Sequence, residues 1–185
     1  AVKRAGEGKV EIAVSGHTVV LGEGEWSKLL PVSFGLSWPL EAAALLRMRV
    51  LSAGDDIRVF CTPMGFDPRE IPEHMKMEYP PGFSKTVAED GGLYDTTGWA
   101  CITNPLKDVE VEEDVFLEHI RKLTDERSSV IYSELAKDDW DFFFAMLGET
   151  DRVQHLMYRA IDPENPMYDA EVAEKYGSSV LDAYK

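Results

Sequence analysis

The chain has 185 residues, 44% of them hydrophobic, which is the size and composition of a globular protein with one large or two small domains. No apolar stretch approaches the length that spans a membrane. The formal net charge of −15 argues against nucleic acid and anionic membranes as partners, because phosphate groups are bound by Lys and Arg. An acidic surface of this kind serves solubility, and a phosphate-bearing substrate stays compatible with it if metal ions reverse the local field.

The sequence gives little information on proteolytic processing or on the cellular compartment. The chain starts with AVKRAGE, without an initial Met and without the apolar core of a signal peptide, so we expect a piece cut from a longer polypeptide. Cys61 and Cys101 lie far apart and outside any Cys-x-x-Cys motif, which favours two free, buried thiols over a disulfide. The compartment stays open, with the cytoplasm favoured.

Residues 1–65 are predicted to form a β-rich subdomain. Apolar residues alternate in 10–14, and apolar runs at 17–21 and 30–36 are separated by glycine-containing turns. Around Met48 the apolar residues alternate with Arg47 and Arg49, so we expect these two arginines to face solvent. The pattern is typical of an antiparallel meander of about five strands with one solvated face.

Residues 66–105 are predicted to be an irregular connection. Prolines and glycines are frequent throughout this range. Structureless connections of this length are often functional or lie at a domain junction. His74 has Glu70, Glu73 and Glu78 nearby, but a metal contact there is a minor alternative to an ordinary polar loop.

Residues 106–185 are predicted to be part of an α/β core. An acidic start at 112–114 and an apolar face at positions 116, 120 and 123 predict a helix, followed by a second amphipathic piece at 130–135. The nearly unbroken apolar run at 140–147 predicts a strand buried on both faces. A helix from Asp151 to Asp162-Pro163 and a final helix over 168–185 complete the pattern. Because one strand is not a sheet, its neighbours must come from elsewhere.

The segment GETDRVQH at 148–155 is the candidate functional site. Asp151 and His155 are one helical turn apart, and they follow the carboxyl end of the predicted strand, where α/β proteins bind ligands. A carboxylate and an imidazole that converge there can hold a metal ion. The alternative is structural: Asp151 caps the helix, Gln154 completes a capping box three residues later, and His155 is only a polar surface residue.

Residues 140–168 resemble type I phosphodiesterase/nucleotide pyrophosphatase proteins of the alkaline phosphatase superfamily. The resemblance is carried by GETDRVQH, Tyr158, Asp162-Pro163 and PMY at 166–168, and more loosely by GEGEWS at 22–27, which is similar to an insert in some prokaryotic members. In that family an Asp-x-x-x-His pair behind a core strand binds one of two zinc ions, so the resemblance implies that Asp151 and His155 are zinc ligands. Animal members usually have Gly where this chain has Gln154, which leaves the substrate subclass open.

The family's remaining machinery is not recognisable in the chain: its Thr or Ser nucleophile, an early metal-binding Asp, an Asp-His-Gly stretch and a further His. The sequence DTTGW at 95–99 is interpreted as a loop that uses Thr and Gly for turn chemistry. We therefore expect an internal fragment of a two-zinc hydrolase of small phosphate- or sulfate-ester substrates, inactive alone and with no catalytic residue of its own. The alternative function is a non-catalytic β-rich binding or interaction module in which Asp151 is only a helix cap.

The other polar and aromatic candidates are expected to be structural. His17 lies in an alternating strand and His119 on a helix, where surface or core roles are commoner than ligation. The tryptophans at 26, 38 and 99 are expected to pack rather than to bind a ligand, although exposed aromatics in a β-rich insert could shape substrate entry.

Overall fold

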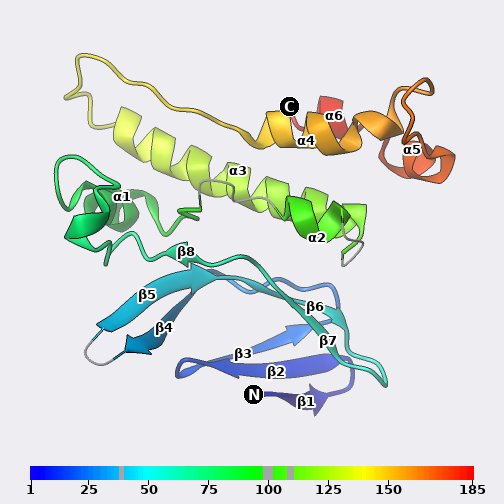
Figure 1. Cartoon of the computed structure of the whole chain (residues 1–185), viewed down its shortest axis with the longest axis horizontal. Coiled ribbons are helices and arrows are strands. Elements are labelled where there is room, and N and C mark those ends of the chain that lie inside the picture. The colour runs from blue at the N-terminus through cyan, green and yellow to red at the C-terminus, as the bar shows by residue number, and fades with distance from the viewer. Residues whose placement is uncertain (38–39, 98–101, 108–110) are drawn as a thin grey trace. The chain divides into compact units, whose positions relative to one another are not determined.

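The computed structural model describes residues 1–37, 40–97, 102–107 and 111–185, which divide into two compact units. One unit comprises Ala1–Glu89 and Leu93–Ala100, and the other comprises Asp90–Gly92 and Cys101–Lys185. The described strands fall in the first unit, and most of the helical residues fall in the second (Figure 1). The predicted mixture of helices with antiparallel sheets is confirmed.

The first unit is built from three small antiparallel sheets. Their strand orders are β1-β2-β3, β4-β5-β8 and β6-β7 (Figure 1). The strands are β1 (Val2–Gly6), β2 (Lys9–Val14), β3 (His17–Gly22), β4 (Leu30–Ser37), β5 (Leu40–Leu46), β6 (Met48–Ser52), β7 (Arg58–Cys61) and β8 (Gly65–Phe66). The antiparallel meander was predicted, but β1, β5 and β8 were not.

The β2–β3 hairpin shows how the sequence sets the register of the first sheet. Val14 pairs with His17 across a two-residue loop, in which Ser15 and Gly16 both have positive φ, 44° and 80°. A two-residue loop with positive φ at both positions matches the twist of the flanking strands. The alternation in β2 then turns Val10 and Ile12 inward, where both are buried with Leu21, Val50 and Ala53.

The prediction that Arg47 and Arg49 face solvent is wrong. Both arginines are buried, as are Leu46 and Val50, whereas Met48 between them is half-buried. Arg47 Nη1 donates to the Ser27 carbonyl oxygen at 3.2 Å, and Arg49 Nε donates to that of Gly24, also at 3.2 Å. Backbone carbonyl partners compensate the burial of these polar groups, so alternation with apolar residues did not indicate a solvated face. Burial also lowers the pKa of Arg47, with the Asp95 charge acting in the opposite direction.

The predicted irregular connection contains regular elements. A 3-10 turn (Glu73–Met75) precedes helix α1 (Phe83–Gly91), and α2 (Thr103–Lys107) lies near the end of the range. The Glu78 carboxylate accepts hydrogen bonds from the backbone N–H groups of Gly82, at 2.7 Å, and Ser84, at 2.5 Å. These contacts satisfy donors at the start of α1 that the helix itself leaves unpaired, and they lower the pKa of Glu78.

The second unit is helical. It contains α3 (Glu113–Leu135), α4 (Glu149–Met157), a 3-10 turn (Tyr158–Ala160), α5 (Ala170–Tyr176) and α6 (Ser179–Asp182). The predicted helix after residue 112 and the second piece at 130–135 are one continuous helix of 23 residues. The predicted final helix is instead two short ones, because α5 ends at Tyr176 and α6 starts at Ser179. Among the described residues, no helix is long and apolar enough to cross a membrane.

The prediction of a buried strand at 140–147 is wrong for this structure. These residues form no strand, and each of them except Phe143 is exposed. The physical reason is that a strand is stable only beside other strands, and the described part of the second unit contains none. The composition of the segment does not reveal whether such neighbours exist. Figure 1 shows the segment as a yellow trace that leaves the end of α3 and leads to α4.

Candidate functional site

Helix α4 is held by one buried side and presents the candidate ligands on another. Val153 and Met157 are completely buried, and Glu149 lies on the same stripe, at the i, i+4 and i+8 positions. The Glu149 carboxylate forms an ion pair of 2.6 Å with Arg127 of α3. Asp151 and His155 are offset by half a turn from this stripe, so both side chains reach solvent.

The two candidate ligands converge. The distance from His155 Nε2 to Asp151 Oδ1 is 3.4 Å, with the side chains 72% and 60% exposed. In a tetrahedral zinc site with bonds of about 2.1 Å, two ligand atoms lie about 3.4 Å apart. The pair therefore fits one edge of such a site, and its donor set, an imidazole nitrogen and a carboxylate oxygen, suits zinc.

Asp151 does not cap the helix. The N-cap residue of α4 is Gly148, which makes no side-chain cap hydrogen bond, and Asp151 is the third residue of the helix. The Gln154 side chain does not reach back to the helix start, because its Nε2 donates to the Tyr184 hydroxyl instead. The capping box considered as the structural alternative is therefore not formed, and capping no longer accounts for an Asp at this position.

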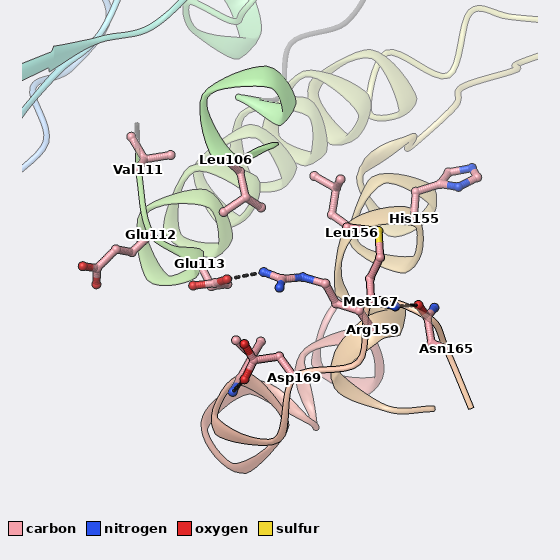
Figure 2. A pocket seen from close by; sticks show the side chains of 11 residues that line it. Leu106, Val111, Glu112, Glu113, His155, Leu156, Arg159, Asn165, Met167 and Asp169 are labelled. Atoms are coloured by element: carbon pink, nitrogen blue, oxygen red, sulfur yellow. Dashed lines mark hydrogen bonds and ion pairs between the residues drawn. The ribbon is translucent and has the colours of Figure 1, made fainter. Parts of the chain in front are cut away.

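A pocket of about 430 Å³ opens beside His155 within the second unit (Figure 2). Its walls are partly apolar, with Leu106, Val111, Leu156, Met167 and Val172, and partly polar, with Glu112, Glu113, His155, Arg159, Asn165 and Asp169. In Figure 2 the His155 ring lies at the edge of the group and points away from the Glu113–Arg159 pair. His155 is thus shared between the pocket rim and the ligand pair.

Several charged side chains in this pocket are already engaged in ion pairs or hydrogen bonds within the protein. Arg159 Nη2 and Glu113 Oε1 form an ion pair, drawn as a dashed line in Figure 2. Asp169 caps α5, because its Oδ1 accepts the backbone N–H groups of Glu171 and Val172 at 2.9 and 3.1 Å. Arg159 is neutralised by Glu113, and no other Lys or Arg lines the pocket among the residues that the structure describes, so its apolar walls suit an uncharged organic group.

The other candidate residues do not join the pair. Within the described ranges, no three or more His, Cys, Asp or Glu side chains are arranged to hold a metal ion. His17 and His74 are exposed in the first unit, and His119 is fully buried on α3. Trp26 packs edge-on against Phe60, with ring centroids 6.3 Å apart, as expected of a packing aromatic. Trp38, Trp99 and Cys101 lie outside the described residues.

The threonines at 96 and 97 take the turn role that was predicted for them. Thr97 donates from its backbone N–H and from Oγ1 to Asp95 Oδ1, at 2.8 and 2.6 Å. Thr96 Oγ1 donates to the Phe66 carbonyl oxygen at 2.7 Å. The Thr97 hydroxyl is therefore used within the loop, and the Thr96 hydroxyl ties the loop to β8. Cys61 is a free thiol, but it is exposed rather than buried.

Sequence reasoning missed Glu149 and Arg127, which position the site helix. A usable signal was present, because Glu149, Val153 and Met157 follow the i, i+4 and i+8 spacing of one helix face. A helix that begins at 149 rather than at 151 puts a carboxylate on its buried face. Such a group requires a cation, and Arg127 supplies it.

Comparisons with models of protein families, with curated proteins and with solved structures find no match to this chain.

Proposed function

We propose that this chain contributes two metal ligands, Asp151 and His155, to a two-zinc hydrolase of phosphoric esters of the phosphodiesterase/nucleotide pyrophosphatase type. The nucleophile and the remaining ligands would come from polypeptide outside residues 1–185, and the helical unit would belong to an alkaline-phosphatase-like α/β core. The observation that carries the proposal is the 3.4 Å approach of His155 Nε2 to Asp151 Oδ1 on a solvent-exposed face of α4.

Within such a site each residue would have a defined task. The Asp151 carboxylate would supply negative charge and one oxygen, and the neutral His155 imidazole would supply Nε2. The Arg127–Glu149 pair would keep α4 in place, because it ties the first turn of the helix to α3. When bound, the metal ions would activate the nucleophile and stabilise charge on the phosphoryl oxygens.

The neighbouring pocket supports an ester rather than free phosphate as substrate. Its apolar walls and its neutralised arginine suit the organic group of a substrate, and the phosphoryl group would remain at the metal pair outside. Because His155 belongs both to the pocket rim and to the ligand pair, one residue would connect the two parts of the substrate site.

A zinc titration of the purified chain tests the ligand assignment. We expect zinc to shift the NMR signals of the His155 ring in a saturable way before those of the other histidines. Asp151→Asn, which keeps the size of the side chain but removes its charge, should weaken the shift, and His155→Ala should remove it. His17→Ala is the matched control, because His17 is an exposed histidine in the other unit. Equal zinc binding by all four proteins would show that the pair is not a metal site.

A second candidate function, a non-catalytic interaction module, is favoured by a different observation. All of residues 140–147 except Phe143 are exposed, and Phe142, Phe144 and Met146 are 83%, 78% and 74% exposed. Large exposed apolar segments mark interaction sites. This candidate differs from the original alternative, because it no longer depends on Asp151 being a helix cap.

A further inference from the structure

Another pocket lies within the first unit, where it is lined by the segment that follows β8 and by the start of α1. Its volume of about 820 Å³ is larger than that of the pocket beside His155. This volume falls in the range of about 300–1,000 Å³ that is usual for small-molecule sites. The apolar part of its lining consists of Pro68, Ile71, Pro72, Met77, Tyr79 and Pro81.

The charged residues of this pocket are mainly cationic. Arg69, Lys76 and Lys85 line it, and Glu78 is the one carboxylate among the lining residues that the structure describes. Both Glu78 oxygens already accept backbone N–H groups at the start of α1. A pocket with an excess of positive charge, in a chain whose net charge is −15, favours an anionic ligand.

The two lysines are hardly engaged by the protein itself. Lys76 forms no ion pair within the part of the chain that the structure describes. The Lys85 Nζ atom lies 3.9 Å from Glu89 Oε1, and with side chains 57% and 58% exposed such a pair contributes little. Lys76 also has a φ of 47°, a conformation that long side chains rarely adopt. Such conformations persist where the surrounding structure holds them, and they are frequent at ligand sites.

Two carboxylates hold the walls of the pocket in place. Asp67 accepts hydrogen bonds from the backbone N–H, Nε and Nη2 of Arg69, and its own N–H donates to the Ala43 carbonyl oxygen of β5 at 3.2 Å. These bonds fix Arg69 but do not use its Nη1 group. On the other wall, the Glu78 bonds fix the start of α1 and therefore the position of Lys85. Walls that are set before a ligand arrives lose less conformational entropy on binding.

The volume and the lining indicate which kind of anion would bind. Inorganic phosphate would leave most of the 820 Å³ unfilled, whereas the apolar walls and the Tyr79 ring suit an aromatic body. Nucleic acids and anionic membranes are disfavoured, because they would bring many negative charges close to the rest of an acidic chain. A small molecule brings only the charge of its own anionic group.

We propose that this pocket binds a small organic anion in which a carboxylate or phosphate group is attached to an aromatic body. Lys76 and Lys85 would bind the anionic group, and the apolar lining would contact the aromatic body. The proposal does not depend on metal binding at Asp151 and His155, which lie in the other unit, so either can fail alone.

An NMR titration of the whole chain with phenylphosphonate and with benzoate tests the proposal. Neither probe contains an ester bond, so hydrolysis does not interfere. We expect saturable shifts of the backbone amide signals of residues 68–85. Phenol, which is uncharged, and inorganic phosphate, which lacks the ring, should both bind more weakly. The stronger of the two probes identifies the preferred anionic group, and binding of either supports the proposal.

Variants of the two lysines test which residues bind the anion. Lys76→Asn removes the charge and is compatible with a positive φ, which Asn adopts more readily than most residues. Lys85→Gln removes the charge and keeps a good helix former in α1. Each change should weaken the binding of the preferred probe by about tenfold, as expected for the loss of one charge-assisted hydrogen bond. Lys28→Gln is the matched control, because Lys28 is an exposed lysine of the same unit outside the pocket.

The results that would overturn the proposal are distinct. Absence of saturable shifts at residues 68–85 with both probes would show that the pocket is not a site for such anions. Equal binding of phenol would show that the ring alone is attracted, and equal binding of inorganic phosphate would show that the apolar walls contribute nothing. Unchanged affinity in the double variant with Lys76→Asn and Lys85→Gln would refute the assignment of the lysines.

Discussion

Arg127 Nη1 lies 2.6 Å from Glu149 Oε1, and this ion pair joins α3 to the first turn of the helix that carries the candidate ligands. The Glu149 side chain is only 3% exposed, whereas that of Arg127 is 25% exposed. Glu149 Oε2 is buried with no hydrogen-bond partner among the described residues, so Arg127 is the cation on which this carboxylate depends. A buried carboxylate that loses its cation is strongly destabilising.

Arg127→Met should therefore lower the free energy of unfolding by about 3 kcal/mol, because it keeps most of the side-chain volume but leaves Glu149 buried without a counter-charge. Urea denaturation followed by the helical circular dichroism signal measures this change. Adding Glu149→Gln to Arg127→Met should recover part of the loss, since the second change removes the unpaired charge. The surface pair Lys85–Glu89, at 3.9 Å, supplies the control: Lys85→Ala should change stability by less than about 1 kcal/mol.

Gly91→Ala should destabilise the second unit by about 1–3 kcal/mol through overpacking. A Cβ at Gly91 would lie 2.9 Å from Val130 Cα, which is backbone of α3 and has little freedom to move. Gly148→Ala is the matched control, because nothing lies within 4 Å of a Cβ at Gly148 and its φ is −84°. Thermal unfolding of the two variants compares them directly, and equal melting temperatures would contradict the close approach.

Asp67 should make the stability of the first unit sensitive to acid. The Arg69 guanidinium donates to this buried carboxylate at 2.5 and 2.9 Å and holds the Asp67 pKa below its ordinary value of 3.8. Because the folded pKa is the lower one, the stabilisation is complete above about pH 3.8 and is lost as the pH falls through the folded pKa.

Asp67→Asn should accordingly cost about 1–3 kcal/mol near neutral pH, a range that allows for the partial exposure of Arg69. The difference in melting temperature between the variant and the unaltered chain should shrink as the pH is lowered toward 2. Thermal unfolding at several pH values, followed by circular dichroism in the strand region, measures it. A difference that grows on acidification would show that the ion pair is not the source of the stability.

The parts of the fold that sequence reasoning predicted well are those fixed by local pattern. The β2–β3 hairpin follows from alternation around Gly16, and the start of α3 follows from acidic residues before an apolar stripe. The close approach of Asp151 to His155 also follows from helical spacing alone. In each of these cases the interaction spans only a few residues of sequence.

The features that sequence reasoning missed depend on distant residues. Arg49 is buried because its guanidinium group donates to the Gly24 carbonyl oxygen and lies over the Trp26 ring. The sequence of residues 46–50 does not indicate these distant contacts. The 140–147 run has the composition of a buried strand, yet burial requires neighbouring strands that the described helical unit lacks. The composition of a segment indicates which environment would bury it, but only the structure shows whether the described chain provides that environment.

The isolated chain should bind zinc weakly and should not hydrolyse bis-p-nitrophenyl phosphate. Asp151 and His155 provide two ligands, whereas catalytic zinc sites usually have three protein ligands and a water, and no third His, Cys, Asp or Glu joins the pair within the described residues. Elemental analysis of the purified chain and a hydrolysis assay with added zinc measure the two properties. Stoichiometric zinc and turnover above the solution rate, both lost in Asp151→Ala, would show that the site is complete in this chain. Weak zinc binding that disappears in His155→Ala but persists in His17→Ala is the result that two converging ligands predict.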